Sequence, residues 1–225
     1  KWGGTMRLMV FSRRTAHEIL RDPLNLAFGV GFPVVLLLLL SAIQANIPVS
    51  LFAIEQLAPG IAVFGLAFLT LFSASLVAKD RESAFLSRLY TTPLTAADFI
   101  LGYLLPVLPI ALLQALITYG VALLLGLPLS VRLLPAVGLI LPIALFFIAI
   151  GLLCGSVLNV KQTGAVCGAL FTNLTAWLSG IWFDLELVGG VYRRIAYALP
   201  FVHAVELERA AIHGVYAAIG PHLLW

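Results

Sequence analysis

Long apolar runs with few polar interruptions recur along the whole chain. Five of them are near the roughly 20 residues that a helix needs to cross a hydrocarbon core about 30 Å thick. Strands of a membrane β-barrel would instead alternate apolar and polar residues over short segments. The pattern therefore predicts an all-α fold, a polytopic membrane helix bundle, with spans at residues 24–43, 58–78, 99–125, 133–158 and 164–183.

Basic residues mark one side of these spans, and Lys and Arg gather on the cytoplasmic side of membrane proteins. They precede the first span and follow the second and the fourth, whereas residues 44–57 contain none and the turn after the third span contains only Arg132. We therefore expect a multi-pass protein of the inner (cytoplasmic) membrane with a cytoplasmic amino terminus. The basic residues concerned are Lys1, Arg7, Arg13, Arg14, Arg21, Lys79, Arg81, Arg88 and Lys161.

Composition narrows the class of protein further. Of the 225 residues, 62% are hydrophobic and only 10% are charged, which is far from the balance of a soluble domain. No stretch remains for a separate catalytic domain, and no Walker motif is present. The net charge of +3 comes from residues beside the spans, so no nucleic-acid partner is expected. Cys154 and Cys167 lie in apolar runs, which favours free thiols over a disulfide or a metal site.

The last part of the chain is too charged for another crossing. Charged side chains cost several kcal/mol each in a span, and residues 184–220 hold Asp184, Glu186, Arg193, Arg194, Glu206, Glu208 and Arg209. Apolar residues there cluster at helical spacing, so we expect short helices at the outer interface. An odd number of crossings and the apolar residues after Pro221 predict a sixth span that this single domain, residues 1–225, lacks because the chain is cut short.

Residues 1–22 predict an amphipathic helix that lies on the membrane surface, because apolar and charged side chains fall on opposite faces. Leu8, Met9, Ala16, Ile19 and Leu20 form the apolar face, and Arg7, Arg14, His17, Glu18 and Arg21 form the charged face. Such a helix can anchor on anionic lipid or dock against a protein partner. The residues alone leave both roles open.

A short, dense segment joins the second and third spans on the expected cytoplasmic side. Within it, apolar and charged residues at helical spacing predict an amphipathic helix that ends before Pro93. Thr95 and Asp98 form a capping-box pattern that begins the third span. An apolar knob rimmed by both signs of charge favours a protein partner over another lipid-bound helix. The knob and its rim are Arg81, Glu82, Phe85, Leu86, Arg88 and Leu89.

Four segments together resemble the membrane permeases of type-2 ATP-binding-cassette (ABC) exporters. They are RDPLNLAFGVGFPVVLLLL after the first helix, APGIAVFG in the second span, DRESAFLSRLYTTPLTAADFILGYLL after it, and ALPFVHAVELERAAIHG near the end. The resemblance covers almost the entire chain, and it implies six spans per permease and two short helices before the last span.

The resemblance also implies partners. In that family the loop after the second span is a coupling helix that docks into a separate ATPase, so Arg81, Glu82, Phe85, Leu86, Arg88 and Leu89 would contact the ATPase. The amino-terminal helix packs nearby, which implicates Arg14, Glu18 and Arg21. The implied complex holds two ATPase copies, with ATP and Mg²⁺ bound there and no cofactor in this chain, and a second permease copy. Its cargo would be an amphipathic or hydrophobic drug, lipid or glycan.

Polar and small residues in the later spans have two readings. Thr172, Asn173, Thr175 and Ser179 could line a translocation path, although Ser and Thr in membrane helices commonly bond to their own backbone. Glycines spaced four apart, at 151 and 155 and at 164 and 168, favour close packing within the chain over a dimer contact. No charged residue lies in the middle of a span, which argues against an ion-coupled carrier.

Two alternatives stay open. Within transporters, a haem-export permease of cytochrome maturation has a similar size and number of spans. In another class, His203, Glu206 and His213 could form a metal or hydrolytic site of an intramembrane enzyme. We favour the interpretation that these three residues lie on the polar faces of interfacial helices, because no HExxH motif and no nucleophile elbow is present.

Overall fold

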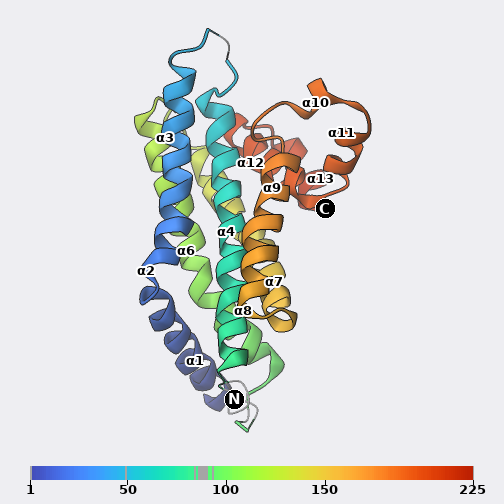
Figure 1. The fold of residues 1–225 in the computed structure, drawn as a ribbon. Helices are drawn as coiled ribbons and strands as arrows, with labels where there is room; N and C mark the ends of the chain where they lie inside the picture. Colours follow the sequence, from blue (N-terminus) through green and yellow to red (C-terminus); the bar gives the residue numbers. More distant parts are fainter. Residues whose placement is uncertain (1, 49, 84, 86–90, 93, 225) are drawn as a thin grey trace.

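The structure is a computed structural model that describes residues 2–48, 50–83, 85, 91–92 and 94–224, with side chains from residue 6 onward. Over these ranges the chain is helical and forms no strand. Figure 1 shows long helices side by side in a bundle, with short helices gathered beside one end. The predicted all-α bundle is confirmed.

The helices form three groups. The first is α1 (Trp2–Leu20), and the last comprises α10 (Leu185–Val188), α11 (Gly190–Tyr197), α12 (Pro200–His213), η3 (Tyr216–Ala218) and α13 (Ile219–Leu223). The middle group has five members. Three are single helices: α4 (Ile54–Glu82), α6 (Ala96–Leu124) and α7 (Leu133–Val157). The other two are continuous helical segments, one made of α2 (Pro23–Leu26), η1 (Ala27–Gly31) and α3 (Phe32–Gln44), and one made of α8 (Val160–Thr163), η2 (Gly164–Phe171) and α9 (Thr172–Leu178).

Local sequence explains several helix ends. Thr95 accepts a hydrogen bond from the Asp98 N–H and Asp98 reaches back to Thr95, so the predicted capping box begins α6. Asp22 caps α2 by accepting from the Asn25 N–H, and Pro23 suits the first helical turn. The wide turns of η1 come just before Pro33, which has no N–H to donate to the helical ladder.

Four helical segments among the described residues are long and apolar enough to cross a membrane: Pro23–Gln44, Ile54–Glu82, Ala96–Leu124 and Leu133–Val157. They match the first four predicted spans, and each end lies within four residues of the predicted one. The fifth predicted span, residues 164–183, is helical only as far as Leu178, in a segment that begins at Val160, and it is not among the four. A fifth and a sixth crossing therefore stay predictions.

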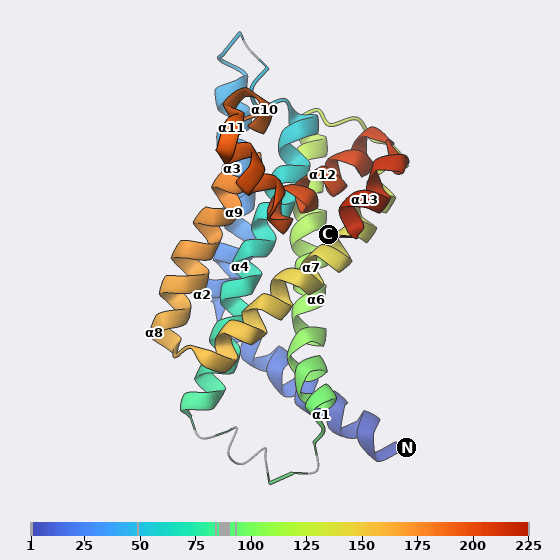
Figure 2. The same cartoon turned by 90° about the vertical axis from the view of Figure 1, so that its right-hand side faces the viewer.

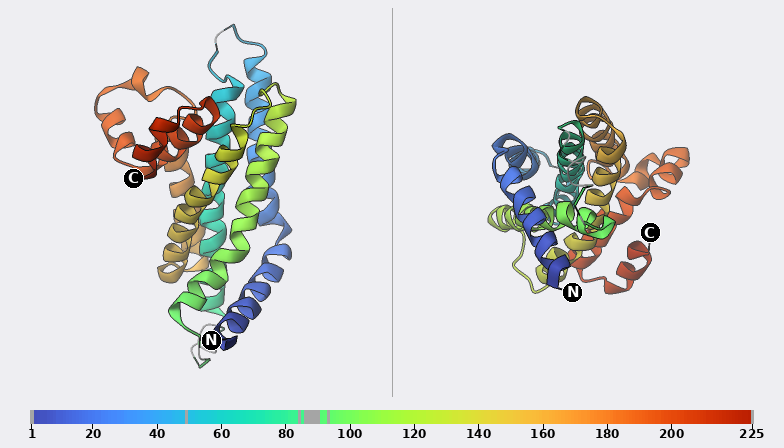
Figure 3. Two further views of the ribbon diagram at one scale, coloured as in Figure 1. Left: turned by 180° about the vertical axis from the view of Figure 1, so that it is seen from behind. Right: turned by 90° about the horizontal axis from the view of Figure 1, so that it is seen from below.

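Loops and short helices divide between the two ends of the bundle. One end, here called the α1 end, holds α1, the end of α4, the start of α6 and the turn from α7 to α8 (Figure 2). The other end, the α12 end, holds the turn after α3, the turn from α6 to α7, and helices α10–α13 (Figure 3). This is the alternation that the distribution of basic residues predicts.

α4 is the centre of the bundle. In its most apolar stretch 83% of the residues are buried, against 22% for Pro23–Gln44 and 33% for Leu133–Val157. The other long helices surround it when the bundle is viewed along its length (Figure 3). A helix that is apolar all round is expected in the interior, so α4 connects the two ends through the core.

α7 packs directly on the backbone of α4 through two glycines. A Cβ added at Gly151 would lie 2.4 Å from the backbone carbonyl oxygen of Thr70, and one at Gly155 would lie 2.4 Å from the backbone carbonyl oxygen of Ala74. The Thr70 hydroxyl also donates to the Phe147 carbonyl oxygen across this contact (2.9 Å). The glycines at 151 and 155 therefore serve packing within the chain, as predicted, although their partner is α4.

We expect Gly151→Ala to separate α7 from α4 and to lower the free energy of unfolding by about 1–3 kcal/mol, because backbone atoms on α4 cannot give way to a methyl group. Gly138→Ala is the matched control on the same helix, since a Cβ there meets nothing within 4 Å. Thermal unfolding midpoints in detergent compare the two variants. Equal midpoints would contradict the packing that we describe.

Candidate functional site

A buried carboxylate organises the α1 end of the bundle. Asp80, near the end of α4, is 2% exposed. Both of its oxygens accept from the Arg14 guanidinium on α1, at 2.5 and 2.6 Å, and the Tyr103 hydroxyl on α6 donates to Oδ2 at 2.6 Å. A two-pronged arginine–carboxylate pair is among the strongest and most directional polar contacts in proteins. It fastens three helices to one another at a single point.

Arg14 extends this arrangement to the segment that follows α4. Its guanidinium lies 4.0 Å from the centre of the Phe85 ring and 2.9 Å from the Glu18 carboxylate. Burial opposes the charge on Arg14, but the hydrogen bond to Asp80 and the charges of Asp80 and Glu18 outweigh it and raise its pKa. Arg14 is therefore the link between α1, Asp80 and the predicted coupling segment.

Aromatic packing closes the gap between α1 and α6. The Phe11 ring stacks on Phe99 (centroids 5.5 Å apart) and meets Tyr103 edge-on at 5.0 Å. Gly102 makes room for it, because a Cβ there would lie 2.0 Å from the Phe11 ring. α1 thus docks on α6 through a ring that fits only against glycine.

The buried face of α1 differs from the predicted one. Phe11, Thr15 and Ile19 are buried, spaced one helical turn apart, whereas Met9 and Leu20 are 66% and 69% exposed. Only Ile19 of the predicted apolar face is fully buried. The predicted composition of this face was wrong, because the residues that α1 buries are those that meet α6, and the sequence does not show where α6 lies. Exposed Met6, Met9, Val10 and Leu20 are left to meet lipid.

The next two residues of α4 hold the turn between α7 and α8. Arg81 donates to the carbonyl oxygens of Gly155 (2.9 Å) and Leu158 (3.1 Å), where α7 ends. Glu82 accepts from the Val160 N–H (2.9 Å), where α8 begins. A cation suits a helix carboxyl end and an anion an amino end. Both side chains are exposed and were predicted to contact an ATPase; that contact stays a prediction, and within the chain they hold this turn.

The remaining residues of the predicted docking surface differ in burial and in their contacts. Phe85 is partly buried and packs against the core, whereas Leu86, Arg88 and Leu89 lie outside the described residues. Arg14 and Glu18 form an ion pair, and Arg21 is exposed. Of the predicted set, the structure therefore brings together Arg14, Glu18 and Phe85 around Asp80.

The polar residues predicted for a translocation path do not form one surface. Thr172, Thr175 and Ser179 share a face, as predicted, but they are buried and their hydroxyls donate to carbonyl oxygens of their own helical segment. Asn173 is exposed on the other side, and its amide also donates to its own segment, to Ala169 O at 2.7 Å. These contacts favour the packing interpretation, because they use the hydroxyl and amide donors within the helix.

The outer metal or hydrolytic site that was left open as an alternative is not assembled by the described residues. His203 contacts His222 (Nδ1 to Nδ1, 3.0 Å) and the Tyr197 carbonyl oxygen (2.9 Å). Glu206 pairs with Arg209, while His213 lies 3.4 Å from the Gln56 amide. Within the described part of the chain, no group of three or more His, Cys, Asp or Glu residues is placed to hold a metal ion.

Sequence reasoning missed the residues on which the site depends. In the sequence Asp80 begins the segment after the second span, Tyr103 falls in the apolar run 99–125, and Phe11 is not among the residues of the predicted apolar face. One signal was available: Asp80 and Arg14 are opposite charges in segments expected on the same side of the membrane. Pairing them across 66 positions requires knowledge of how α1 crosses α4.

Comparison with known protein families decides the class of the chain. The family model described as ABC-2 type transporter matches residues 6–213. The chain belongs to this family. No individual curated protein and no solved structure gave a match.

Family membership makes this ABC-2 protein a transmembrane subunit of an ABC transporter, and a multi-pass membrane protein. It accounts for the resemblance in the four quoted segments, which fall in the matched range except for Gly214 at the end of the last one. ABC transporters draw energy from ATPase partners, so the family implies such a partner in general. The family is one of transporters, which sets aside the intramembrane enzyme.

We expect Asp80→Ala in this ABC-2 subunit to free α1 from the bundle, because Arg14 and the Tyr103 hydroxyl both lose their acceptor. Since Arg14 is about one-third exposed, the cost should be about 1–3 kcal/mol. Limited proteolysis within residues 1–22 measures the release. Arg13→Ala is the control, as Arg13 is an exposed neighbour of Arg14 on α1. Equal cleavage of both variants would show that Asp80 does not hold α1.

Proposed function

We propose that this chain is the transmembrane subunit of an ATP-driven exporter that moves an amphipathic or hydrophobic substrate, such as a drug, lipid or glycan, out of the cytoplasm. Two copies of the chain, or the chain and a close homologue, would pair and bind two cytoplasmic ATPase subunits, which hold ATP and Mg²⁺. The observation that carries the proposal is the cluster of Arg14, Asp80, Tyr103 and Phe85, which ties the predicted coupling segment to three helices of the bundle.

The cluster suits the transmission of force. Phe85 lies against Arg14, Arg14 holds Asp80 on α4, and Asp80 holds Tyr103 on α6. A displacement of the segment after α4 would therefore reach α1, α4 and α6 together. Because α4 runs through the core to the α12 end, movement imposed at one end has a continuous packed route to the other. Coupling of this kind needs an ATPase that binds two permease states with different affinity.

Charge distribution supports the orientation. The α1 end carries Arg7, Arg13, Arg14, Arg21, Lys79, Arg81 and Lys161, and basic residues gather on the cytoplasmic side. We infer that the protein lies in the inner (cytoplasmic) membrane, that this end faces the cytoplasm, and that the amino terminus is cytoplasmic. The ATPase partners would then meet the α1 end, where Phe85 lies.

The exposed apolar side chains on the outward faces of the helices are consistent with contact to an apolar cargo or to a second copy of the chain. Large apolar side chains stay exposed along α6 and α7, including Leu113, Leu116, Leu145 and Leu153, and Trp177 is exposed on α9. Lipid covers some of this surface in the membrane. A translocation path lined by such side chains between two copies would accept hydrophobic or amphipathic molecules. Nothing observed favours haem in particular.

The proposal is tested by purifying the tagged full-length chain from native membranes. A roughly stoichiometric ATP-binding subunit should come with it, and Phe85→Asp should lose that subunit, because a carboxylate replaces the ring against Arg14 and the partner. Leu51→Asp is the control, since Leu51 is an exposed apolar residue at the α12 end. Elution volume in size exclusion shows that each variant is folded.

Two results would count against the proposal. The wild-type chain could bring no ATPase, which removes the energy source. Alternatively, Phe85→Asp and Leu51→Asp could retain the ATPase equally, which removes the coupling segment from the contact. Phe85→Leu, which keeps an apolar side chain, should retain the ATPase if the ring serves only to fill space.

A further inference from the structure

Helix α12 presents two unlike faces at the α12 end. One face, with Glu206, Arg209, Ala210 and His213, lines a cavity of about 690 Å³ together with residues at the start of α4 and after α9. The opposite face, with Phe201, Val205 and Ala211, is buried in the apolar core of the bundle. α12 is therefore the wall between this cavity and the core.

The core-facing side of α12 contains a carboxyl group that nothing described so far uses. Glu208 is 0% exposed and lies on the same face as Val205 and Ala211. The Tyr119 hydroxyl of α6 donates to its Oε2 at 2.6 Å. Its Oε1 is buried without a hydrogen-bond partner. A buried carboxylate with one donor and no cation is costly, and such groups usually take up a proton instead.

Charged and titratable groups on the surrounding elements are engaged elsewhere. On α12 itself, Arg209 bonds to Glu206 and to the Gly180 carbonyl oxygen, and His203 contacts His222 of α13 and the Tyr197 carbonyl oxygen at the end of α11. The other acidic, basic and histidine residues described at this end are His213 of α12, Glu55 of α4, Arg132 before α7, Asp184 and Glu186 at the start of α10, and Arg193 and Arg194 of α11. Among the described residues, no salt bridge to Glu208 is formed.

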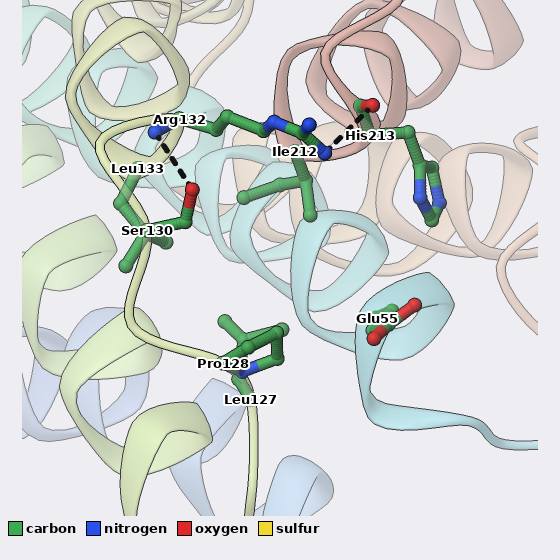
Figure 4. Close-up of a pocket in the computed structure, with 8 residues that line it drawn as sticks. All are labelled: Glu55, Leu127, Pro128, Ser130, Arg132, Leu133, Ile212 and His213. Atoms are coloured by element: carbon green, nitrogen blue, oxygen red, sulfur yellow. Dashed lines mark hydrogen bonds between the residues drawn. The ribbon is translucent and has the colours of Figure 1, made fainter.

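Arg132 acts on a different part of α12. Its guanidinium donates to the His213 carbonyl oxygen at 3.1 Å, where the helix ends, and Figure 4 shows it reaching there from the turn between α6 and α7. Glu55 and the His213 ring lie around the same small pocket, not on the core side of the helix. This contact holds the end of α12 whatever the charge on Glu208.

The electrostatic surroundings agree with the geometry. Burial raises the pKa of Glu208 to about 8, and the hydrogen bond from Tyr119 works against that shift. No neighbouring charge contributes to the shift. Burial thus favours the neutral form of the carboxyl group.

We propose that Glu208 is a proton-binding site that fastens α12 to α6 while its carboxyl group is neutral and loosens α12 when it ionises. The bound ligand is a proton, taken from the outer solution. Because α12 forms a wall of the 690 Å³ cavity, the proton would set the shape of that cavity. This inference concerns the chain alone and does not depend on an ATPase partner.

The direction of the pH effect follows from proton uptake. A free glutamate titrates near pH 4.3, so between that pH and about 8 the docked state binds one more proton than the undocked state. Docking is then fully favoured below pH 4, weakens about tenfold per pH unit as pH rises through this window, and changes no further above pH 8 to 9.

Infrared difference spectroscopy of the full chain in lipid vesicles tests the proton directly. A protonated carboxyl band should be present at pH 6.5 and should disappear with a midpoint near pH 8. Glu208→Gln should lack this titration, while Glu55→Gln, a control at an exposed glutamate of the same end, should keep it. Tyr119→Phe should move the midpoint upward, because the phenol stabilises the ionised form.

Hydrogen exchange tests the mechanical consequence. Protection of residues 200–213, corrected for the chemical exchange rate at each pH, should fall about a hundredfold between pH 5.5 and 7.5 in the wild type, and stay constant in Glu208→Gln. A carboxyl band absent from the wild type at pH 6.5 would overturn the proton site. A normal titration with the same pH dependence of protection in both proteins would overturn its control of α12.

Discussion

The arrangement at the α1 end depends on balancing one buried negative charge. Asp80 is almost fully enclosed, and an enclosed carboxylate without a partner costs several kcal/mol. Arg14 supplies that partner, and it belongs to a helix that would otherwise only lie on the membrane surface. Once Arg14 is fixed, the Phe85 ring and the Glu18 carboxylate have defined places around it. The ion pair with Asp80 thus attaches α1 to the helix bundle.

α4 carries the influence of this charge through the protein. Its neighbour α7 touches its backbone at Gly151 and Gly155, and close-packed interiors with no free volume move as units. The Thr70 hydroxyl adds a hydrogen bond across the same contact, to the Phe147 carbonyl oxygen of α7. A closely packed centre between two polar ends is the arrangement that the proposed coupling requires.

The sequence could predict those features that follow from one-dimensional chemistry. Apolar run length located the first four spans, and the Thr95–Asp98 pattern located the start of α6. Features that depend on which helices touch could not be predicted. Phe11 belongs to the buried face of α1 because Gly102 lies opposite it. The hydrogen bonds of Arg81 and Glu82 to the α7–α8 turn join segments more than 70 residues apart, so the sequence gives no sign of them.

The two buried carboxyl groups show how the same side-chain chemistry acquires opposite behaviour. Asp80 receives a guanidinium and a phenol, so its charge is held in place by two other helices. Glu208 receives a phenol alone and leaves one oxygen unpartnered, so burial acts against its charge. The roles that we propose follow from this difference: an ion pair held at both oxygens suits the transmission of force, and a group that gains or loses a proton suits the attachment and release of α12. Among the described residues no arginine is bonded to Glu208, which is why burial favours its neutral form.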